Sequence, residues 1–230
     1  MKTIGLIGGM SWESTVEYYQ IINNTIKAQL GGFHSAKCIL YSVDFHEIEA
    51  CQSSGQWNKT AEILTQAAIS LEKAGADFIV ICTNTMHKVA GQIQSSISIP
   101  ILHIAEVTAD ELKKNNMKKV ALLGTKYTME QDFYKQKLID CGIKVVVPEA
   151  EDRVKINDII FRELCLGKIS DRSRNIYLDI IRKLTQSGAQ GVVLGCTEIG
   201  LLIKQSDTST PLFDTTLIHA TRAALLAIEP

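Results

Sequence analysis

The chain contains an internal repeat, which restricts its fold more than any other feature of the sequence. Residues 74–85 (AGADFIVICTNT) align without gaps on residues 187–198 (SGAQGVVLGCTE). Two further pairs keep the same order, with residues 2–9 matching residues 118–125 and residues 100–103 matching residues 211–214. Each copy mixes apolar runs with helical patterns, so the repeat indicates a duplicated α/β unit.

Short apolar runs predict the strands of this unit. Four runs predict buried central strands, at residues 4–7, 78–81, 120–123 and 191–194. Residues 37–43 and 143–147 predict two further strands. Strands that alternate with longer helical patterns are typical of βαβ units and a largely parallel sheet. We therefore expect an α/β fold with parallel sheets.

Hydroxyl residues with capping-box spacing predict where two helices begin. Ser14 is followed three positions later by Glu17, and Thr128 by Gln131. In a capping box the hydroxyl and the later acid or amide each accept a backbone N–H of the first turn. We expect helices to open at these two matching sites.

Prolines mark the predicted domain boundaries. Pro100 and Pro211 each precede a short apolar run, and the residue before a proline favours extended backbone. We expect the chain to cross between domains there. The predicted domains are residues 1–99 with 210–230, and residues 100–209.

The composition argues against several classes of partner. The 230 residues carry 24 Lys and Arg against 25 Asp and Glu, a net charge of -1. Because no long single-sign run is present, we expect neither nucleic acid nor an anionic membrane as a partner. No stretch approaches the roughly 18 apolar residues of a membrane helix, and the start lacks a signal-peptide core. We expect a cytoplasmic protein that binds a small molecule.

The six cysteines follow no disulfide or metal pattern. There is no CxxC pair and no Cys/His cluster with zinc spacing, so we expect no structural metal and no disulfide framework. Most buried cysteines behave as small apolar residues. The sequence leaves two interpretations of Cys196 open. It is a packed apolar residue, or it is a reactive group, which the polar residues Thr197 and Glu198 directly after it favour.

Small and hydroxyl residues follow four of the predicted strands. They lie at residues 8–11, 83–85, 124–125 and 196–198. In a parallel sheet, ligands bind beyond the carboxyl ends of the strands. Exposed backbone N–H groups in such turns suit an anion such as a carboxylate. Thr83 and Cys196 occupy equivalent positions of the repeat.

Two groups on opposite faces of one carbon can invert a stereocentre, because one removes a proton and the other supplies one. A free cysteine has a pKa of about 8.5, which a helix N-terminus lowers. We therefore expect Cys196 to be substantially thiolate near neutral pH. The hydroxyl of Thr83 is too weak an acid to be a resting base, but it can position a substrate or relay a proton from water.

These motifs resemble those of the cofactor-independent aspartate/glutamate racemases. The resemblance spans the whole chain through residues 8–14, 82–87, 124–125 and 195–198. It looks most like the L-aspartate/glutamate-specific subgroup, in which threonine replaces one of two cysteines. The resemblance implies two similar Rossmann-like domains related by pseudo-twofold symmetry, with the active site in the interdomain cleft. It also implies a homodimer and a reaction without pyridoxal phosphate or metal.

Site residues carry over from the family by position. The two catalytic positions map onto Thr83 and Cys196, while Cys82 is a neighbour whose side chain should point to the other face of its strand. Substrate contacts map onto Met10, Gln52, Asn84, Thr85, Thr125 and Thr197. A family lysine falls on Cys165, so the preference between aspartate and glutamate stays open. Lys155 and Lys168 are candidate replacements.

The expected activity is racemisation of L-aspartate, L-glutamate or both. Cys196 removes the α-proton, and reprotonation occurs on the Thr83 side. Two alternatives remain: an enzyme of the maleate isomerase or arylmalonate decarboxylase type, which uses the second cysteine as a nucleophile or single proton donor, and a non-catalytic sensor of dicarboxylates or amino acids.

Overall fold

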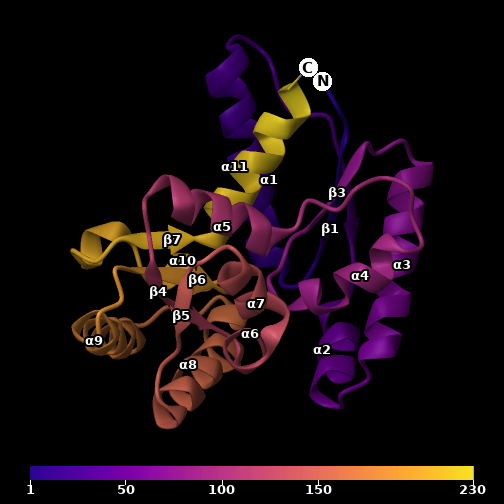
Figure 1. The fold of residues 1–230 in the computed structure, drawn as a ribbon. Helices are drawn as coiled ribbons and strands as arrows, with labels where there is room; N and C mark the ends of the chain where they lie inside the picture. The colour runs from indigo at the N-terminus through magenta and orange to yellow at the C-terminus, as the bar shows by residue number, and fades with distance from the viewer. Residues whose placement is uncertain (230) are drawn as a thin grey trace. The chain divides into compact units, whose positions relative to one another are not determined.

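The computed structural model describes residues 1–229, which form two units (Figure 1). Unit 1 comprises Met1–Ile104 and the C-terminal segment from His219, and unit 2 comprises Ala105–Ile218. Each unit contains one parallel sheet, which confirms the predicted α/β class. Within residues 1–229, no helix combines the length and apolar character needed to span a bilayer.

Unit 1 is built on a three-stranded parallel sheet. Its strands are β1 (Ile4–Gly8), β2 (Cys38–Ser42) and β3 (Phe78–Ile81), in the order β2-β1-β3. Both β1 and β3 are buried along their whole length, because apolar residues project from both of their faces. The strands predicted at these positions are confirmed.

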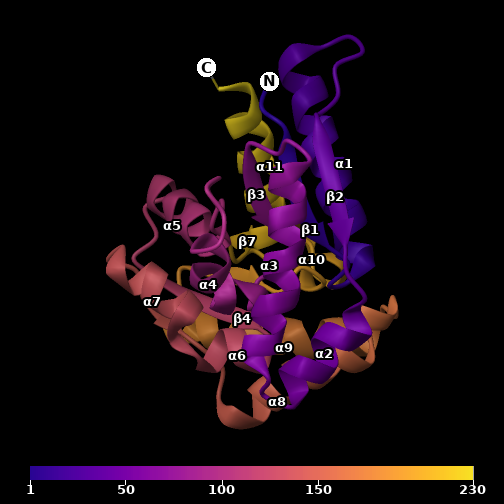
Figure 2. The same ribbon diagram turned by 90° about the vertical axis from the view of Figure 1, so that its right-hand side faces the viewer.

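Helices cover both faces of this sheet. They are α1 (Trp12–Leu30), α2 (Phe45–Ser53), α3 (Trp57–Lys73), the 3-10 helix η1 (Thr85–Val89) and α4 (Ala90–Gln94). The helices α5 (Ile104–Lys114) and α11 (Thr215–Ile228) each have residues in both units. Figures 1 and 2 show α3 on one side of β1 and β3, and α1 with α11 on the other. Alternate strand residues therefore enter two separate apolar clusters.

Unit 2 is built on a four-stranded parallel sheet. Its strands are β4 (Lys119–Gly124), β5 (Lys144–Val146), β6 (Gly191–Gly195) and β7 (Leu212–Asp214), in the order β5-β4-β6-β7. The surrounding helices are α6 (Lys126–Glu130), α7 (Asp132–Asp140), α8 (Ala150–Arg162), η2 (Leu164–Leu166), α9 (Asp171–Gln186), α10 (Ile199–Leu202) and η3 (Gln205–Asp207). Because β7 pairs with β6, residues 210–218 lie in unit 2, whereas the sequence prediction placed them in the first domain.

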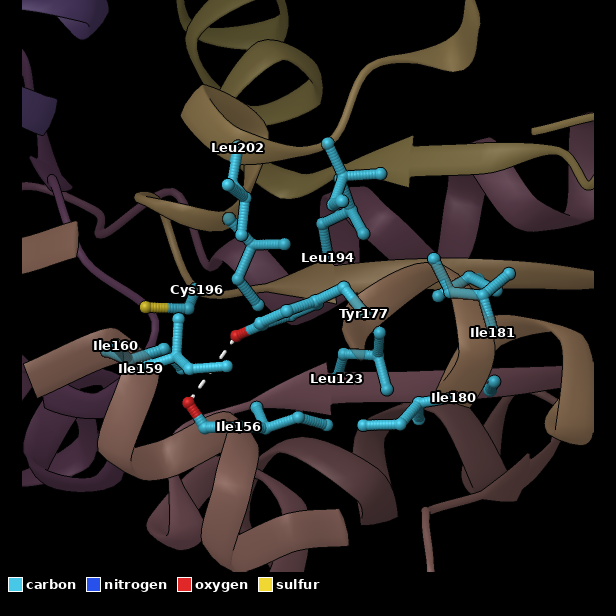
Figure 3. Close-up of a cluster of buried hydrophobic side chains, with 14 of the residues drawn as sticks. Leu123, Ile156, Ile159, Ile160, Tyr177, Ile180, Ile181, Leu194, Cys196 and Leu202 are labelled. Carbon is cyan, nitrogen blue, oxygen red and sulfur yellow. Dashed lines mark hydrogen bonds between the residues drawn. The ribbon is translucent and has the colours of Figure 1, made fainter. Parts of the chain in front are cut away.

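One apolar cluster joins β4 and β6 to α8 and α9. Leu123 and Leu194 from the sheet pack with residues of both helices (Figure 3). The hydroxyl of Tyr177 in α9 donates to the carbonyl oxygen of Ile156 in α8, at 3.4 Å. Cys196 lies at one edge of this cluster, with its sulfur directed away from Leu123 and Leu194.

The two sheets repeat one topology. The order β2-β1-β3 in unit 1 matches β5-β4-β6 in unit 2. The flanking segments also match, since the N–H of Ile79 donates to the Pro100 carbonyl at 2.9 Å and the N–H of Val192 donates to the Pro211 carbonyl at 2.8 Å. The sequence repeat is therefore a structural repeat.

The predicted helix starts are wrong at both capping boxes. The N-cap of α1 is Ser11, whose hydroxyl accepts the N–H of Ser14, and the N-cap of α6 is Thr125, whose hydroxyl accepts the N–H of Thr128. In each case a hydroxyl residue three positions upstream is the N-cap. The residue that was predicted as the cap therefore lies inside the first turn of the helix. When several hydroxyl residues lie near a helix start, each can act as the N-cap, and their spacing in the sequence does not show which one does.

A buried histidine ties α11 to the rest of unit 1. His219 Nδ1 lies 2.8 Å from the Tyr18 hydroxyl, and Nε2 lies 2.8 Å from the carbonyl oxygen of Leu102. A carbonyl only accepts, so Nε2 carries the proton and Nδ1 accepts from Tyr18. Burial, with a smaller contribution from His87, lowers the pKa of His219 to about 3. His219 is therefore neutral in the folded protein.

We predict that His219 makes the protein less stable in acid. The unfolded chain protonates this histidine below pH 6.5 whereas the folded chain does not, so its contribution to stability falls as the pH drops from 6.5 towards 3. The expected slope is about 1.4 kcal/mol per pH unit well inside that window. Urea unfolding between pH 7 and pH 5 should show a shallower loss for His219→Gln than for the wild type. The exposed His46→Gln is the control, and equal slopes for His219→Gln and the wild type would contradict the assignment.

Candidate functional site

Two polar turns leave the same edge of the unit 1 sheet. Ile7 of β1 pairs with Ile81 of β3, so the turn that follows β1 and the loop that follows β3 begin side by side. Gly9 in the first turn has φ 92°, and a Cβ atom there would collide with the carbonyl oxygen of Val43. Only glycine fits this close approach. Met10, a predicted substrate contact, follows it and is buried.

Thr83 is the second residue after β3 and is buried. Its neighbour Cys82 enters the opposite apolar cluster beside Tyr18 and is fully buried. Burial also raises the pKa of the Cys82 thiol. Cys82 therefore lies on the face of the sheet opposite Ile79 and Ile81, and its orientation away from Thr83 stays a prediction.

His87 fixes the backbone of the Thr83 loop. Its Nε2 accepts the N–H of Ile104 at 3.2 Å, so Nδ1 carries the proton and donates to the carbonyl oxygen of Thr83 at 2.8 Å. Burial first, and the nearby His103 second, hold the pKa of His87 well below its usual value. His87 is thus a neutral positioning residue with both ring nitrogens occupied.

The remaining predicted residues of unit 1 are all buried. Asn84 and Thr85 follow Thr83 directly, and Thr85 begins η1. Gln52 lies near the end of α2, in the segment that joins the carboxyl end of β2 to the start of α3. Unit 1 therefore gathers Met10, Thr83, Asn84 and Thr85 around the carboxyl ends of β1 and β3.

Unit 2 arranges its predicted residues in the same way. Gly124 pairs with Gly195, so the loops that start at Thr125 and Cys196 leave one edge of the sheet together. The Thr125 hydroxyl caps α6 by accepting the N–H of Thr128 at 3.3 Å. Cys196 and Thr197 are both buried.

Glu198 is a site residue to which the sequence analysis assigned no role. The Cys196 thiol donates to Glu198 Oε2 at 2.9 Å, and the Thr197 hydroxyl donates to the same oxygen at 2.8 Å. Glu198 is only 2% exposed. The signal that points to it is its position, two residues after a cysteine that ends a buried strand.

The thiol of Cys196 is protonated at rest, and the expectation of a thiolate is wrong. Burial raises the pKa of this thiol well above its usual value, and the carboxylate of Glu198 raises it further. The helix that follows, α10, has only 4 residues, so its dipole is too small to reverse these effects. The resting site is a protonated thiol that donates a hydrogen bond to the Glu198 carboxylate.

Neither Lys155 nor Lys168 is an evident replacement for the family lysine that corresponds to Cys165. Cys165 packs against the apolar cluster of unit 2. The Lys155 ammonium donates to the buried Asp152 carboxylate at 2.8 Å and is thereby engaged. Lys168 is exposed. Within residues 1–229, no group of three or more His, Cys, Asp or Glu is arranged to hold a metal ion.

The chain matches one protein family over most of its length. Residues 7–223 match the Asp/Glu/Hydantoin racemase family. The chain belongs to this family. It is 56% identical to a proposed Asp/Glu racemase from Yersinia pestis, which it covers over 100% of both chains with a TM-score of 0.92.

Two further relatives agree with this membership. An aspartate racemase homologue from Pyrococcus horikoshii is 39% identical over 100% of both chains, with a TM-score of 0.85. A broad specificity amino-acid racemase from Bacillus subtilis is 26% identical over 72% of each chain. The family and these relatives support an isomerase of the racemase type.

We predict that removing the Glu198 charge makes Cys196 more reactive. Glu198→Gln takes away a negative charge beside the thiol, so the thiol pKa should fall and more thiolate should form at neutral pH. Alkylation by iodoacetamide, followed at Cys196 by peptide mass spectrometry, should be faster in this variant than in the wild type. Glu163→Gln is the control, because Glu163 bonds Ser173 rather than Cys196. Slower alkylation in Glu198→Gln would contradict the arrangement.

Proposed function

We propose that this chain is a cofactor-independent racemase of acidic amino acids, converting L-aspartate, L-glutamate or both to the D-enantiomer. The contact between the Cys196 thiol and the Glu198 carboxylate, found in a member of this family, carries the proposal. Similar chains include an aspartate racemase homologue. The reaction uses no pyridoxal phosphate and no metal, and the enzyme works in the cytoplasm on a free amino acid, without nucleic acid or membrane.

Glu198 prepares Cys196 to act as the base. The thiol transfers its proton to Glu198 Oε2, with which it is already hydrogen-bonded, and the resulting thiolate removes the α-proton of the L-enantiomer. A base with a raised pKa binds a proton more strongly, which suits the weakly acidic α-carbon. The α-proton then resides on sulfur, and Glu198 releases the thiol's original proton to water.

Thr83 serves the opposite face of the α-carbon. Its hydroxyl donates a proton to the carbanion and is restored by a proton from water. Asn84, Thr85 and Thr125 donate from their side chains, and Thr197 from its backbone N–H because its hydroxyl already donates to Glu198. These donors hold the α-carboxylate, whose negative charge grows as the α-proton leaves. Gln52 binds the distal carboxylate, with Met10 as an apolar wall.

The unequal pair of catalytic groups has a kinetic consequence. The equilibrium constant between enantiomers is one, so kcat/KM must be equal in the two directions. A preference for the L-enantiomer therefore means that kcat and KM each differ between the two enantiomers while their ratio is the same. Reprotonation through Thr83 limits turnover.

The proposed enzyme is a homodimer, with α1 contributing to the interface. Trp12, Val16 and Tyr19 are 65%, 44% and 53% exposed, and their spacing places them on one face of the helix. Leu40 and Tyr41 of the edge strand β2 are exposed as well. Apolar side chains that gather on one exposed helix face are typical of a protein–protein interface.

We predict that catalysis depends on Cys196 and is altered at Thr83. Cys196→Ala should lower the rate of D-aspartate or D-glutamate formation by several orders of magnitude, as expected for loss of the sole activated base. Thr83→Cys should raise kcat from the D-enantiomer by restoring a thiol on that side. Chiral chromatography from each pure enantiomer measures both effects. Retained turnover in Cys196→Ala would contradict the mechanism.

We predict that charge on the exposed face of α1 dissociates the dimer. Val16→Glu combined with Tyr19→Lys places charges where apolar side chains are expected to meet, so the variant should elute as a folded monomer. Light scattering after size exclusion measures the mass, and circular dichroism checks the fold. Gln66→Lys on the exposed side of α3 should remain dimeric. A monomeric wild type would rule out the proposed assembly.

A further inference from the structure

Glu13 belongs to the motif that follows β1, yet the proposed reaction gives it no role. It lies in the first turn of α1, shortly after Met10. The helix begins where β1 ends, so Glu13 is near the carboxyl edge of the unit 1 sheet. Trp12 on one side of it is exposed, whereas Ser14 on the other is fully buried.

One carboxylate oxygen of Glu13 is buried without a partner. Among residues 1–229, Oε2 is shielded from solvent and accepts no hydrogen bond, and Glu13 forms no ion pair. A buried carboxylate oxygen loses its hydration, which is costly unless a donor replaces the water. Glu13 Oε2 therefore lacks a hydrogen-bond donor, and a ligand with N–H groups is one way to supply it.

The turn around Glu13 does not use this carboxylate. The Ser11 hydroxyl caps α1 by accepting the N–H of Ser14 at 3.4 Å. The Thr15 hydroxyl accepts the N–H of Gly9 at 2.9 Å and donates to the Ser11 carbonyl at 2.8 Å. These bonds hold the turn together, so Glu13 is free to serve a ligand. Its negative charge also interacts favourably with the helix N-terminus, but that interaction needs no burial of the oxygen.

We infer that Glu13 binds the α-ammonium group of the substrate. This inference rests on the proposed function, because it assumes an amino acid at this edge of the sheet. A primary ammonium brings a positive charge and three N–H donors, which match the unpartnered carboxylate oxygen. Thr83, Asn84 and Thr85, which follow β3 at the same edge of the sheet, are uncharged and suit the carboxylate groups of the same molecule.

The test compares two ligands that differ only at the amine. Succinate has both carboxylates of L-aspartate but no ammonium group. Calorimetric titration should show that Glu13→Gln binds L-aspartate about 10- to 100-fold more weakly than the wild type, as expected for loss of a charged hydrogen bond. Succinate should bind the variant as tightly as the wild type, or more tightly. Glu13→Asp keeps the charge and should recover part of the affinity for L-aspartate.

A second acidic residue provides the matched control. Glu47 lies in the first turn of α2 and is exposed. Glu47→Gln should leave the affinity for both ligands unchanged. An equal loss for L-aspartate and succinate in Glu13→Gln, or no loss for L-aspartate, would overturn the assignment.

The outcomes separate this inference from the proposed function. A wild type that binds L-aspartate but exchanges the α-proton of neither L-aspartate nor L-glutamate would overturn the racemase proposal, while the ligand comparison would still decide the role of Glu13. A racemising wild type whose Glu13→Gln variant binds L-aspartate equally well would overturn the Glu13 assignment alone. A wild type that binds neither L-aspartate nor L-glutamate would overturn both.

Discussion

Parallel pairing of β1 with β3, and of β4 with β6, is the constraint on which the candidate site depends. Ile7 pairs with Ile81, and Gly124 pairs with Gly195, so the loop after each strand starts beside the loop after its neighbour. Strands that run the same way place their carboxyl ends at one edge, where the chain turns into helices. Reversing one strand of either pair would send its loop to the opposite edge.

Within this frame, burial determines the chemistry of Cys196. A thiol and a carboxylate that share a buried space disfavour two negative charges, so the proton stays on sulfur at rest and is shared towards Glu198. This arrangement keeps the thiol protected from oxidation and alkylation, which attack the thiolate. It also makes the thiolate a strong base once it forms, which the α-carbon of an amino acid requires.

Much of the fold could be predicted because the repeat combines two independent signals. Apolar runs identify β1, β3, β4 and β6, and the matched order of the copies predicts that the two units share a topology. Cys82 enters the apolar cluster opposite Ile81, as strand alternation predicts. Chain crossings were harder to locate, because Pro100 and Pro211 both accept hydrogen bonds from strand residues and so stay with their sheets.

Other features depend on three-dimensional surroundings that sequence spacing does not contain. Ser11 and Thr125 cap helices although better-spaced hydroxyls follow them. Cys196 is protonated because it is buried and because the Glu198 carboxylate lies against its thiol. The order of residues Cys196, Thr197 and Glu198 in the sequence predicts neither the burial nor the contact. The unpartnered oxygen of Glu13 likewise emerges only when the whole turn is in place.

The most direct test is proton NMR of the wild-type protein in deuterated buffer, with L-aspartate and L-glutamate in separate samples and chiral chromatography in parallel. The account predicts that at least one substrate loses its α-proton signal and yields the D-enantiomer, with deuterium entering the L-form faster than the D-form accumulates. Retention of the α-proton in both substrates would contradict it.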